Sequence, residues 1–244
     1  MSPALDLVTV DAVHLHAHRR AASGVRRGAA VIVHGFGGSG DEPHVAALAD
    51  ALQDSGLDVL TYDARGHGAS GGEATLGDRE RLDVAAAVDA IAVDGLPLVL
   101  VGASMGAIAA LRYAADARGR VTGVVTVACP ARWRLPRNAR GVLSALLTQT
   151  WLGRSFARHS MRIRIARGFS RVAPPIELVA MVGVPLAVIH GRGDPFIAPA
   201  DAEMLYAAAA EPKRLALVDG MAHAFEPAVT PSIIDAIEWL LSLA

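Results

Sequence analysis

Residues 98–106 read Leu-Val-Leu-Val-Gly-Ala-Ser-Met-Gly, and this stretch decides the fold. Its apolar start predicts a buried strand, and the residues from 105 to about 116 predict a helix. The pattern Gly102-x-Ser104-x-Gly106 therefore occupies a strand-to-helix turn, which projects a serine from the carboxyl end of a sheet. Gly102 and Gly106 avoid collisions with neighbouring backbone in so tight a turn. Ser104 is the candidate nucleophile; the plain alternative is a serine in a turn of small residues.

Short apolar runs alternate with amphipathic stretches on both sides of this turn. The first two predicted strands form a hairpin, and Asp78 is the expected N-cap of the second helix. Further strands are predicted at 5–10, 13–18, 29–34, 58–62, 121–129, 185–190 and 214–218, and further helices at 43–54, 78–93, 199–210 and 231–243. This alternation predicts an α/β fold with a mostly parallel central sheet flanked by helices.

The alternation breaks between residues 131 and 182, which we interpret as an insertion into a core formed by residues 1–130 and 183–244. It contains an amphipathic stretch at 140–152 and an Arg/Ile alternation at 161–165. One side of the amphipathic stretch is apolar, and it is expected either to line a substrate pocket or to anchor the insertion on the core; its residues are Val142, Leu143, Leu146, Leu147 and Trp151.

Charge is distributed unevenly along the 244 residues. The net charge is −1, which argues against a chain that binds nucleic acid through its overall charge. Residues 130–176 nevertheless hold ten arginines and neither Asp nor Glu, so the rest of the chain carries −11. Three uses are open for these arginines: an anionic substrate, an anionic lipid surface, or the acidic remainder of the chain. The last is the favoured interpretation.

Composition excludes several classes of protein. A hydrophobic content of 52% excludes a disordered chain. No stretch reaches the ~18 apolar residues of a transmembrane helix. The first twelve residues lack the basic start of a secretory signal, so a cytoplasmic protein is expected. The single cysteine, Cys129, is expected to be buried and excludes a disulfide framework. His14, His16 and His18 are expected on a solvated strand face and not at a metal. The oligomeric state is not predicted.

A base and an acid for Ser104 are found in two later loops. His223 follows the last predicted strand, and Asp194 follows the strand before it. Loops after the carboxyl ends of parallel strands meet at the edge where Ser104 is expected. A serine hydroxyl needs such a base, and the base needs an acid that holds its tautomer. Asp219 is the alternative acid, although it ends a different strand.

Together these motifs resemble the α/β-hydrolase family over nearly the whole chain outside 131–182. His-Gly-Phe-Gly-Gly at 34–38 resembles its oxyanion loop, and Tyr-Asp-Ala-Arg-Gly-His-Gly-Ala-Ser at 62–70 resembles its Asp-x-Arg-Gly-His-Gly-x-Ser turn. Gly-Arg-Gly-Asp at 191–194 and Gly-Met-Ala-His at 220–223 resemble its acid and histidine loops. The resemblance implies a hydrolase of the Ser-His-Asp type without a cofactor or metal, and an insertion placed as a cap over the nucleophile.

The expected activity is cleavage of a small-molecule carboxylic ester or thioester through an acyl-enzyme on Ser104. His223 is the general base and acid, Asp194 orients it, and the backbone N–H groups of Phe36 and Met105 form the oxyanion hole. The alternatives are an acyltransferase with the same triad and a non-catalytic binding protein. The arginines add the hypothesis of an anionic acyl donor, such as a coenzyme-A or carrier-protein thioester. His34 and His67 are expected to orient their loops.

Overall fold

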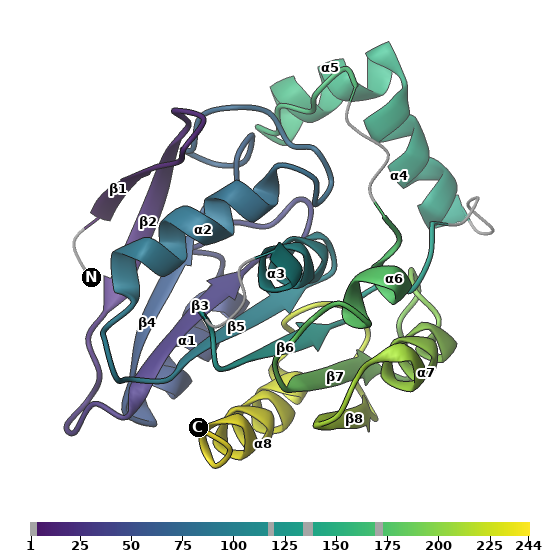
Figure 1. Ribbon diagram of the computed structural model, residues 1–244. Helices are drawn as coiled ribbons and strands as arrows, with labels where there is room; N and C mark the ends of the chain where they lie inside the picture. Colours follow the sequence, from purple (N-terminus) through teal and green to yellow (C-terminus); the bar gives the residue numbers. More distant parts are fainter. Residues whose placement is uncertain (1–3, 117–119, 134–138, 169–172) are drawn as a thin grey trace.

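A computed structural model describes residues 4–116, 120–133, 139–168 and 173–244. These residues form an eight-stranded sheet in the order β1-β2-β4-β3-β5-β6-β7-β8, with helices on both faces (Figure 1). The strands are β1 (Ala4–Val8), β2 (His14–Arg20), β3 (Gly28–Val33), β4 (Leu57–Tyr62), β5 (Leu98–Ala103), β6 (Gly123–Val127), β7 (Leu186–Gly191) and β8 (Lys213–Val218). β2 pairs antiparallel with β1 and β4, and all other pairs are parallel.

The central strands are buried on both faces, which explains their continuous apolar sequences. One face is covered by α1 (Pro43–Asp54) and α8 (Thr230–Leu241), whose apolar side chains share a core with that face. The other is covered by α2 (Glu80–Ile91), α3 (Met105–Asp116), α6 (Pro175–Val179) and α7 (Pro199–Ala208). A short 3₁₀ helix, η1 (Pro227–Val229), precedes α8. These two layers fix the strand ends that carry the candidate site.

The predicted α/β architecture is confirmed, with a difference at the start of α2. Asp78 was expected to cap this helix, but the N-cap position is Arg79 and no side chain caps it. The carboxylate of Asp78 lies 2.9 Å from the guanidinium of Arg112 on α3. Glu80 instead accepts hydrogen bonds from the backbone of Thr75 and Gly77 and from the Thr75 hydroxyl. The loop before α2 is therefore held by the buried Glu80 in the first turn of the helix, and Asp78 does not cap it.

The interval 131–182 contains a pair of helices, α4 (Ala139–Gln149) and α5 (Trp151–Ser160), and then α6. α4 and α5 lie apart from the two helical layers, at the top right of Figure 1. After α5 the chain returns to the core, where Ile165 forms a bridge with Ala74. α6 packs in the main core through Leu178 and Val179. The assignment of 131–182 as a cap remains a prediction.

On the apolar side of α4 and α5, Leu143, Leu146 and Trp151 are exposed to solvent, whereas Leu147 is half-buried. None of these three exposed residues belongs to the described core clusters or lines the cavity at residues 34–38, so the role expected of this apolar side stays a prediction. Among the described residues, no helix is long and apolar enough to cross a membrane. Within those same ranges, no group of three or more His, Cys, Asp or Glu side chains has the arrangement of a metal site.

Candidate active site

Ser104 lies at the turn between β5 and α3 with φ of 51°, in the left-handed region that a serine rarely adopts. Its backbone N–H donates to the Val127 carbonyl at 2.9 Å, which ties the turn to β6. A Cβ at Gly102 would lie 2.6 Å from the Gly106 carbonyl oxygen, and a Cβ at Gly106 would overlap the carbonyl of Val33. Both glycines are therefore required by close approach, as expected, and the strained turn carries a serine.

The glycine-rich loop after β3 lies directly against this turn. A Cβ on Gly35 would be 3.4 Å from the Cβ of Ser104. The Gly35 carbonyl accepts hydrogen bonds from Nδ1 of His34 at 2.7 Å and from the N–H of Gly38 at 3.1 Å. The Phe36 N–H belongs to the same planar peptide, so it points the opposite way. Within the described ranges, no protein acceptor takes up the N–H of Phe36 or of Met105.

His223 and Asp194 meet in the manner expected of a base and its orienting acid. Nδ1 of His223 lies 2.7 Å from Oδ2 of Asp194, whose side chain is fully buried. Because a carboxylate only accepts, Nδ1 carries the proton and Nε2 keeps its lone pair. Oδ1 of Asp194 accepts from the N–H groups of Phe196 and Ile197 at 2.8 and 3.0 Å. Both carboxylate oxygens of Asp194 therefore accept hydrogen bonds, which fixes the side chain.

Asp219, the alternative acid, is not brought to His223. It is exposed and lies 3.1 Å from the guanidinium of Arg192. Sequence reasoning also missed Glu226, whose carboxylate accepts from the N–H groups of Ala222 at 2.8 Å and His223 at 3.4 Å. The sequence offered one signal for this role of Glu226, namely an acidic residue three positions after His223 and directly before Pro227.

A second missed residue is His190, at the end of β7. Its side chain is fully buried, and Nε2 lies 3.0 Å from the carbonyl of Ile197 and 3.4 Å from Oδ2 of Asp194. It therefore packs beneath the loop that carries the acid. Its position four residues before Asp194 was a weak signal, because that spacing alone does not place a strand residue beside a loop residue.

A cavity of about 350 Å³ connects the glycine-rich loop to the histidine loop. Its lining includes Gly35, Phe36 and His223, and Met161 from the end of α5. Phe36 also packs on Ala157 and Ile163, so the segment after α5 forms part of the wall around this loop. Among the described residues, no hydrogen bond joins the hydroxyl of Ser104 to His223. Catalytic hydrogen bonds are often long before substrate binds.

Two buried histidines hold the glycine-rich loop in place, as expected. Nε2 of His34 accepts from the N–H of Ala64 at 2.9 Å while its Nδ1 donates to Gly35. Nε2 of His67 accepts from the N–H of Gly37 at 3.2 Å, and its Nδ1 donates to the Arg65 carbonyl at 3.1 Å. Burial lowers the pKa of His34 to about 4 and also lowers the pKa of His67. Both rings are therefore neutral at pH 7.

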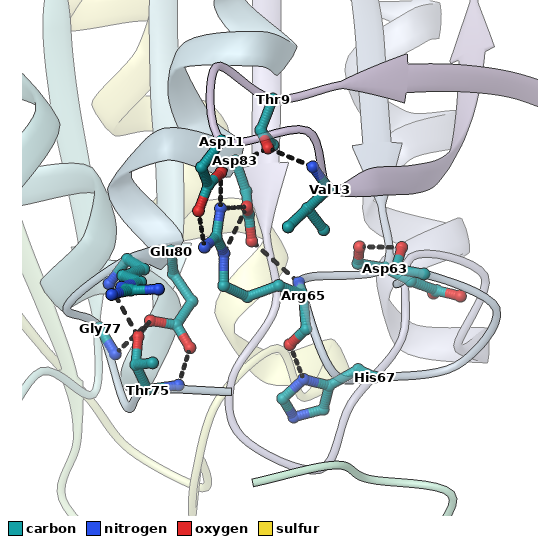
Figure 2. Close-up of polar contacts among 12 residues, drawn as sticks. Thr9, Asp11, Val13, Asp63, Arg65, His67, Thr75, Gly77, Glu80 and Asp83 are labelled. Carbon is teal, nitrogen blue, oxygen red and sulfur yellow. Dashed lines mark hydrogen bonds and ion pairs between the residues drawn. The ribbon is translucent and has the colours of Figure 1, made fainter. Parts of the chain in front are cut away.

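The turn that carries His67 is held by a buried ionic network (Figure 2). The guanidinium of Arg65 donates to Asp83 at 2.8 Å and to both oxygens of Asp11 at 2.8 and 3.0 Å. Hydrogen bonding to Arg65 holds the pKa of the Asp11 carboxyl well below its usual range. Nearby, Asp63 accepts from the N–H of Gly40 at 2.8 Å. The network links the turn between β1 and β2 to α2 and to the turn that carries His67, whose ring contacts the glycine-rich loop.

The neutral state of His34 predicts a loss of stability in mild acid. The folded pKa lies below the ordinary value of 6.5, so the unfolded chain binds the proton first as pH falls. The contribution of His34 is complete above pH 6.5 and is lost as pH falls from there toward 4. By ~1.4 kcal/mol per pKa unit, the contribution of His34 alone to the free energy of unfolding should be roughly 2 kcal/mol smaller at pH 5 than at pH 7.5.

Urea unfolding at several pH values measures this slope, and His34→Gln should flatten it. Val25→Ser, at a valine that is 84% exposed, changes no titratable group and is the control that should leave the slope unchanged. An equal slope in the wild type and His34→Gln would contradict the assignment.

Comparisons with known proteins agree with this architecture. The chain is 31% identical over 191 residues to the uncharacterized protein Rv2307c of Mycobacterium tuberculosis, covering 77% of this chain and 60% of that protein. It is 28% identical over 176 residues to the uncharacterized protein YqkD of Bacillus subtilis, covering 70% and 57%. The chain thus spans about three fifths of the length of these curated relatives.

Solved structures show the same fold. The Pyrococcus furiosus esterase Pf2001 superposes with a TM-score of 0.76 at 22% identity, covering 99% of this chain and 91% of that one. A thermophilic esterase from Thermogutta terrifontis gives a TM-score of 0.73 at 20% identity, covering 98% and 99%. At these identities the likeness establishes the α/β-hydrolase fold.

The family model described as Hydrolase_4, serine aminopeptidase S33, matches residues 24–172. This range contains the glycine-rich loop and the Ser104 turn and ends before Asp194 and His223. It covers more than half of the chain, and the sheet order, the serine turn and the loops at the strand ends all accord with it. The chain therefore belongs to the serine aminopeptidase S33 family of α/β hydrolases.

Proposed function

We propose that this protein is a serine hydrolase that cleaves small carboxylic esters or thioesters through an acyl-enzyme on Ser104. The observation that carries the proposal is the 2.7 Å contact between Nδ1 of His223 and the buried Asp194, beside a cavity shared with the glycine-rich loop. A serine on a strained turn next to that loop supplies the nucleophile.

The first half of the reaction makes the acyl-enzyme. Oγ of Ser104 attacks the carbonyl carbon while its proton passes to Nε2 of His223. Asp194 holds the ring with Nδ1 protonated and stabilises the imidazolium that forms. The negative charge on the carbonyl oxygen is met by the N–H groups of Phe36 and Met105. His223 then gives its proton to the leaving alcohol or thiol as the carbon–oxygen or carbon–sulfur bond breaks.

In the second half, a water molecule loses a proton to His223 and attacks the acyl carbon, and Ser104 leaves with that proton restored to it. An acyltransferase would replace the water by an alcohol or thiol and keep every other step. A cavity of about 350 Å³ is near the lower end of small-molecule sites, which favours a small to medium acyl group.

Purified protein should be tested with p-nitrophenyl esters of two to twelve carbons, acyl-CoA thioesters and aminoacyl p-nitroanilides. The anilides test for the aminopeptidase activity that the family description names. The expected result is faster turnover of a short or medium ester than of every anilide. A competing alcohol should be acylated only if the protein is a transferase. Absence of turnover and of serine labelling would favour the binding-protein alternative.

His67 provides a further prediction, since its ring accepts from Gly37 next to the Phe36 N–H. His67→Ala should lower kcat on the order of tenfold with KM little changed, because the loop donor acts mainly in the transition state. His67→Gln should restore part of the loss by offering a carbonyl acceptor. Steady-state kinetics and a thermal melt check this; a change in KM alone would contradict the positioning role.

A further inference from the structure

The helical pair α4–α5 presents large apolar side chains to solvent. Trp151 and Leu152 are each 70% exposed, and Phe156 is 56% exposed. On α4, Leu143 and Leu146 are 58% and 50% exposed. We call these five residues the hairpin apolar face. Large exposed apolar side chains gathered on one helical pair are typical of a contact site for a partner or a membrane.

The two helices form a firm support for this face. The Thr150 side chain accepts from the N–H of Gly153 at 2.9 Å and donates to the Leu146 carbonyl at 2.7 Å, which caps α5 and ties it to α4. A Cβ on Gly153 would overlap that same carbonyl, so the helices approach closely here. Ala157 is buried on the inner side of α5. The exposed side chains therefore remain outside because the inner side is already filled.

Cations border the apolar face, and no acidic partner for them is found in the described part of the chain. Arg154 and Arg158 are one turn apart on α5, and the former reaches the Thr148 carbonyl at 3.2 Å. Among the described residues, no carboxylate forms an ion pair with any described arginine of the insertion: Arg132, Arg154, Arg158, Arg162, Arg164 and Arg167. Arg134, Arg137 and Arg171 lie outside those residues, as does the side chain of Arg140.

Elsewhere the arginines behave differently. Most described arginines of the core pair with carboxylates, as in Arg27–Glu238 at 2.6 Å and Arg120–Asp89 at 2.5 Å; Arg79 is an exception. The favoured expectation, that the insertion's arginines pair with the acidic core, is thus unsupported for the described ones. Substrate steering gains no support either, because Met161 is the cavity's lining residue from the insertion and no described arginine lines it.

The arrangement on α5 matches a helix that lies in a membrane interface. Positions 151, 152 and 156 fall within one arc of the helix, which Ser155 and His159 share. Positions 154 and 158 fall beside this arc, and 153 and 157 face inward. Such a helix buries its apolar arc at the level of the lipid headgroups while flanking arginines contact anionic lipids. Arginine side chains can extend their charge past an apolar boundary toward phosphate.

We propose that the α4–α5 hairpin is a docking surface for an anionic lipid bilayer. Two independent features select this occupant: an exposed aromatic and aliphatic face, and a flanking positive charge that the described carboxylates leave unmatched. A soluble anion would need the charge but not the apolar face. A second copy of this chain would bring the same unmatched arginines together. This proposal concerns binding and does not depend on the proposed ester hydrolysis.

The test is vesicle flotation of the full chain with phosphatidylcholine vesicles and with vesicles containing 30% phosphatidylglycerol. Binding is expected to the anionic vesicles, at least tenfold weaker to the neutral ones, and reduced by 0.5 M salt. Trp151→Ser/Phe156→Ser and, separately, Arg154→Gln/Arg158→Gln should each weaken binding at least tenfold. Val25→Ser, at a valine that is 84% exposed, is the control and should bind as wild type.

Thermal melts of all variants should agree within a few degrees, since the changed side chains are at the surface. Absence of binding, equal binding to both vesicles, or full binding by the hairpin variants would overturn the proposal. Sedimentation without lipid provides the other decisive outcome. A dimer that Trp151→Ser/Phe156→Ser dissociates would assign this face to a contact between two copies instead. Hydrolysis measured with a soluble ester should be unchanged in every variant, which separates this test from that of the activity.

Discussion

Ser104→Ala should remove nearly all ester hydrolysis, with kcat falling by roughly 10⁵–10⁶. The proposed reaction depends on a covalent bond to Oγ, and alanine offers no nucleophile. The stability of the fold should be unchanged, because alanine tolerates the turn no worse than serine and keeps the backbone hydrogen bond from residue 104 to the Val127 carbonyl. Initial rates on the best p-nitrophenyl ester measure the effect. Ser242→Ala, at an exposed serine of the last turn, is the matched control.

His223→Ala should cost about as much as Ser104→Ala, and the double variant should be little worse than either. The two side chains act together in one proton transfer, so the first substitution already removes the rate enhancement that the second would remove. Additive losses in the double variant would contradict a shared proton transfer between Ser104 and His223.

Asp194→Asn should lower kcat on the order of 10⁴ while preserving the fold. Asparagine can still accept from the N–H groups of Phe196 and Ile197, but its amide can present a donor to Nδ1 of His223 and so favour the wrong tautomer. Asp219→Asn is the matched control, since that carboxylate pairs with Arg192 at the surface. Wild-type turnover in Asp194→Asn together with its loss in Asp219→Asn would reverse the assignment of the acid.

Much of the fold could be predicted from the sequence, because its elements have strong local signals. The predicted bounds of α1 and α3 agree with the structure, and the strand alternation gave the parallel sheet. α6 was missed because five residues give no helical period; packing on α3 and α7 and a hydrogen bond from Ile176 to the Ala131 carbonyl hold it in place. The capping role expected of Asp78 failed because tertiary contacts decided the outcome: Arg112 on a distant helix takes its carboxylate.

In the candidate site, too, local motifs predicted some residues, whereas others depend on tertiary contacts. The motifs predicted where Ser104, Asp194 and His223 lie, since each follows the carboxyl end of a strand. The positions of Glu226 and His190 depend on how loops fold back on one another, so no local pattern marked them. The ionic network around Arg65 joins residues far apart in the chain, which spacing alone cannot reveal. The stretch 140–152 was predicted as amphipathic, with Leu143, Leu146 and Trp151 on its apolar side, whereas Phe156 lay outside that prediction. Which side met water depended on the placement of α4 and α5.

Reaction with a fluorophosphonate tests the central claim most directly, because the reagent requires a base-activated serine but no knowledge of the substrate. Intact mass and peptide mapping would follow the adduct. The account predicts one adduct per chain, at Ser104, absent from Ser104→Ala and formed much more slowly in His223→Ala and Asp194→Asn. A wild-type protein that remains unmodified, or one modified at another serine, would contradict the claim that Ser104 is an activated nucleophile.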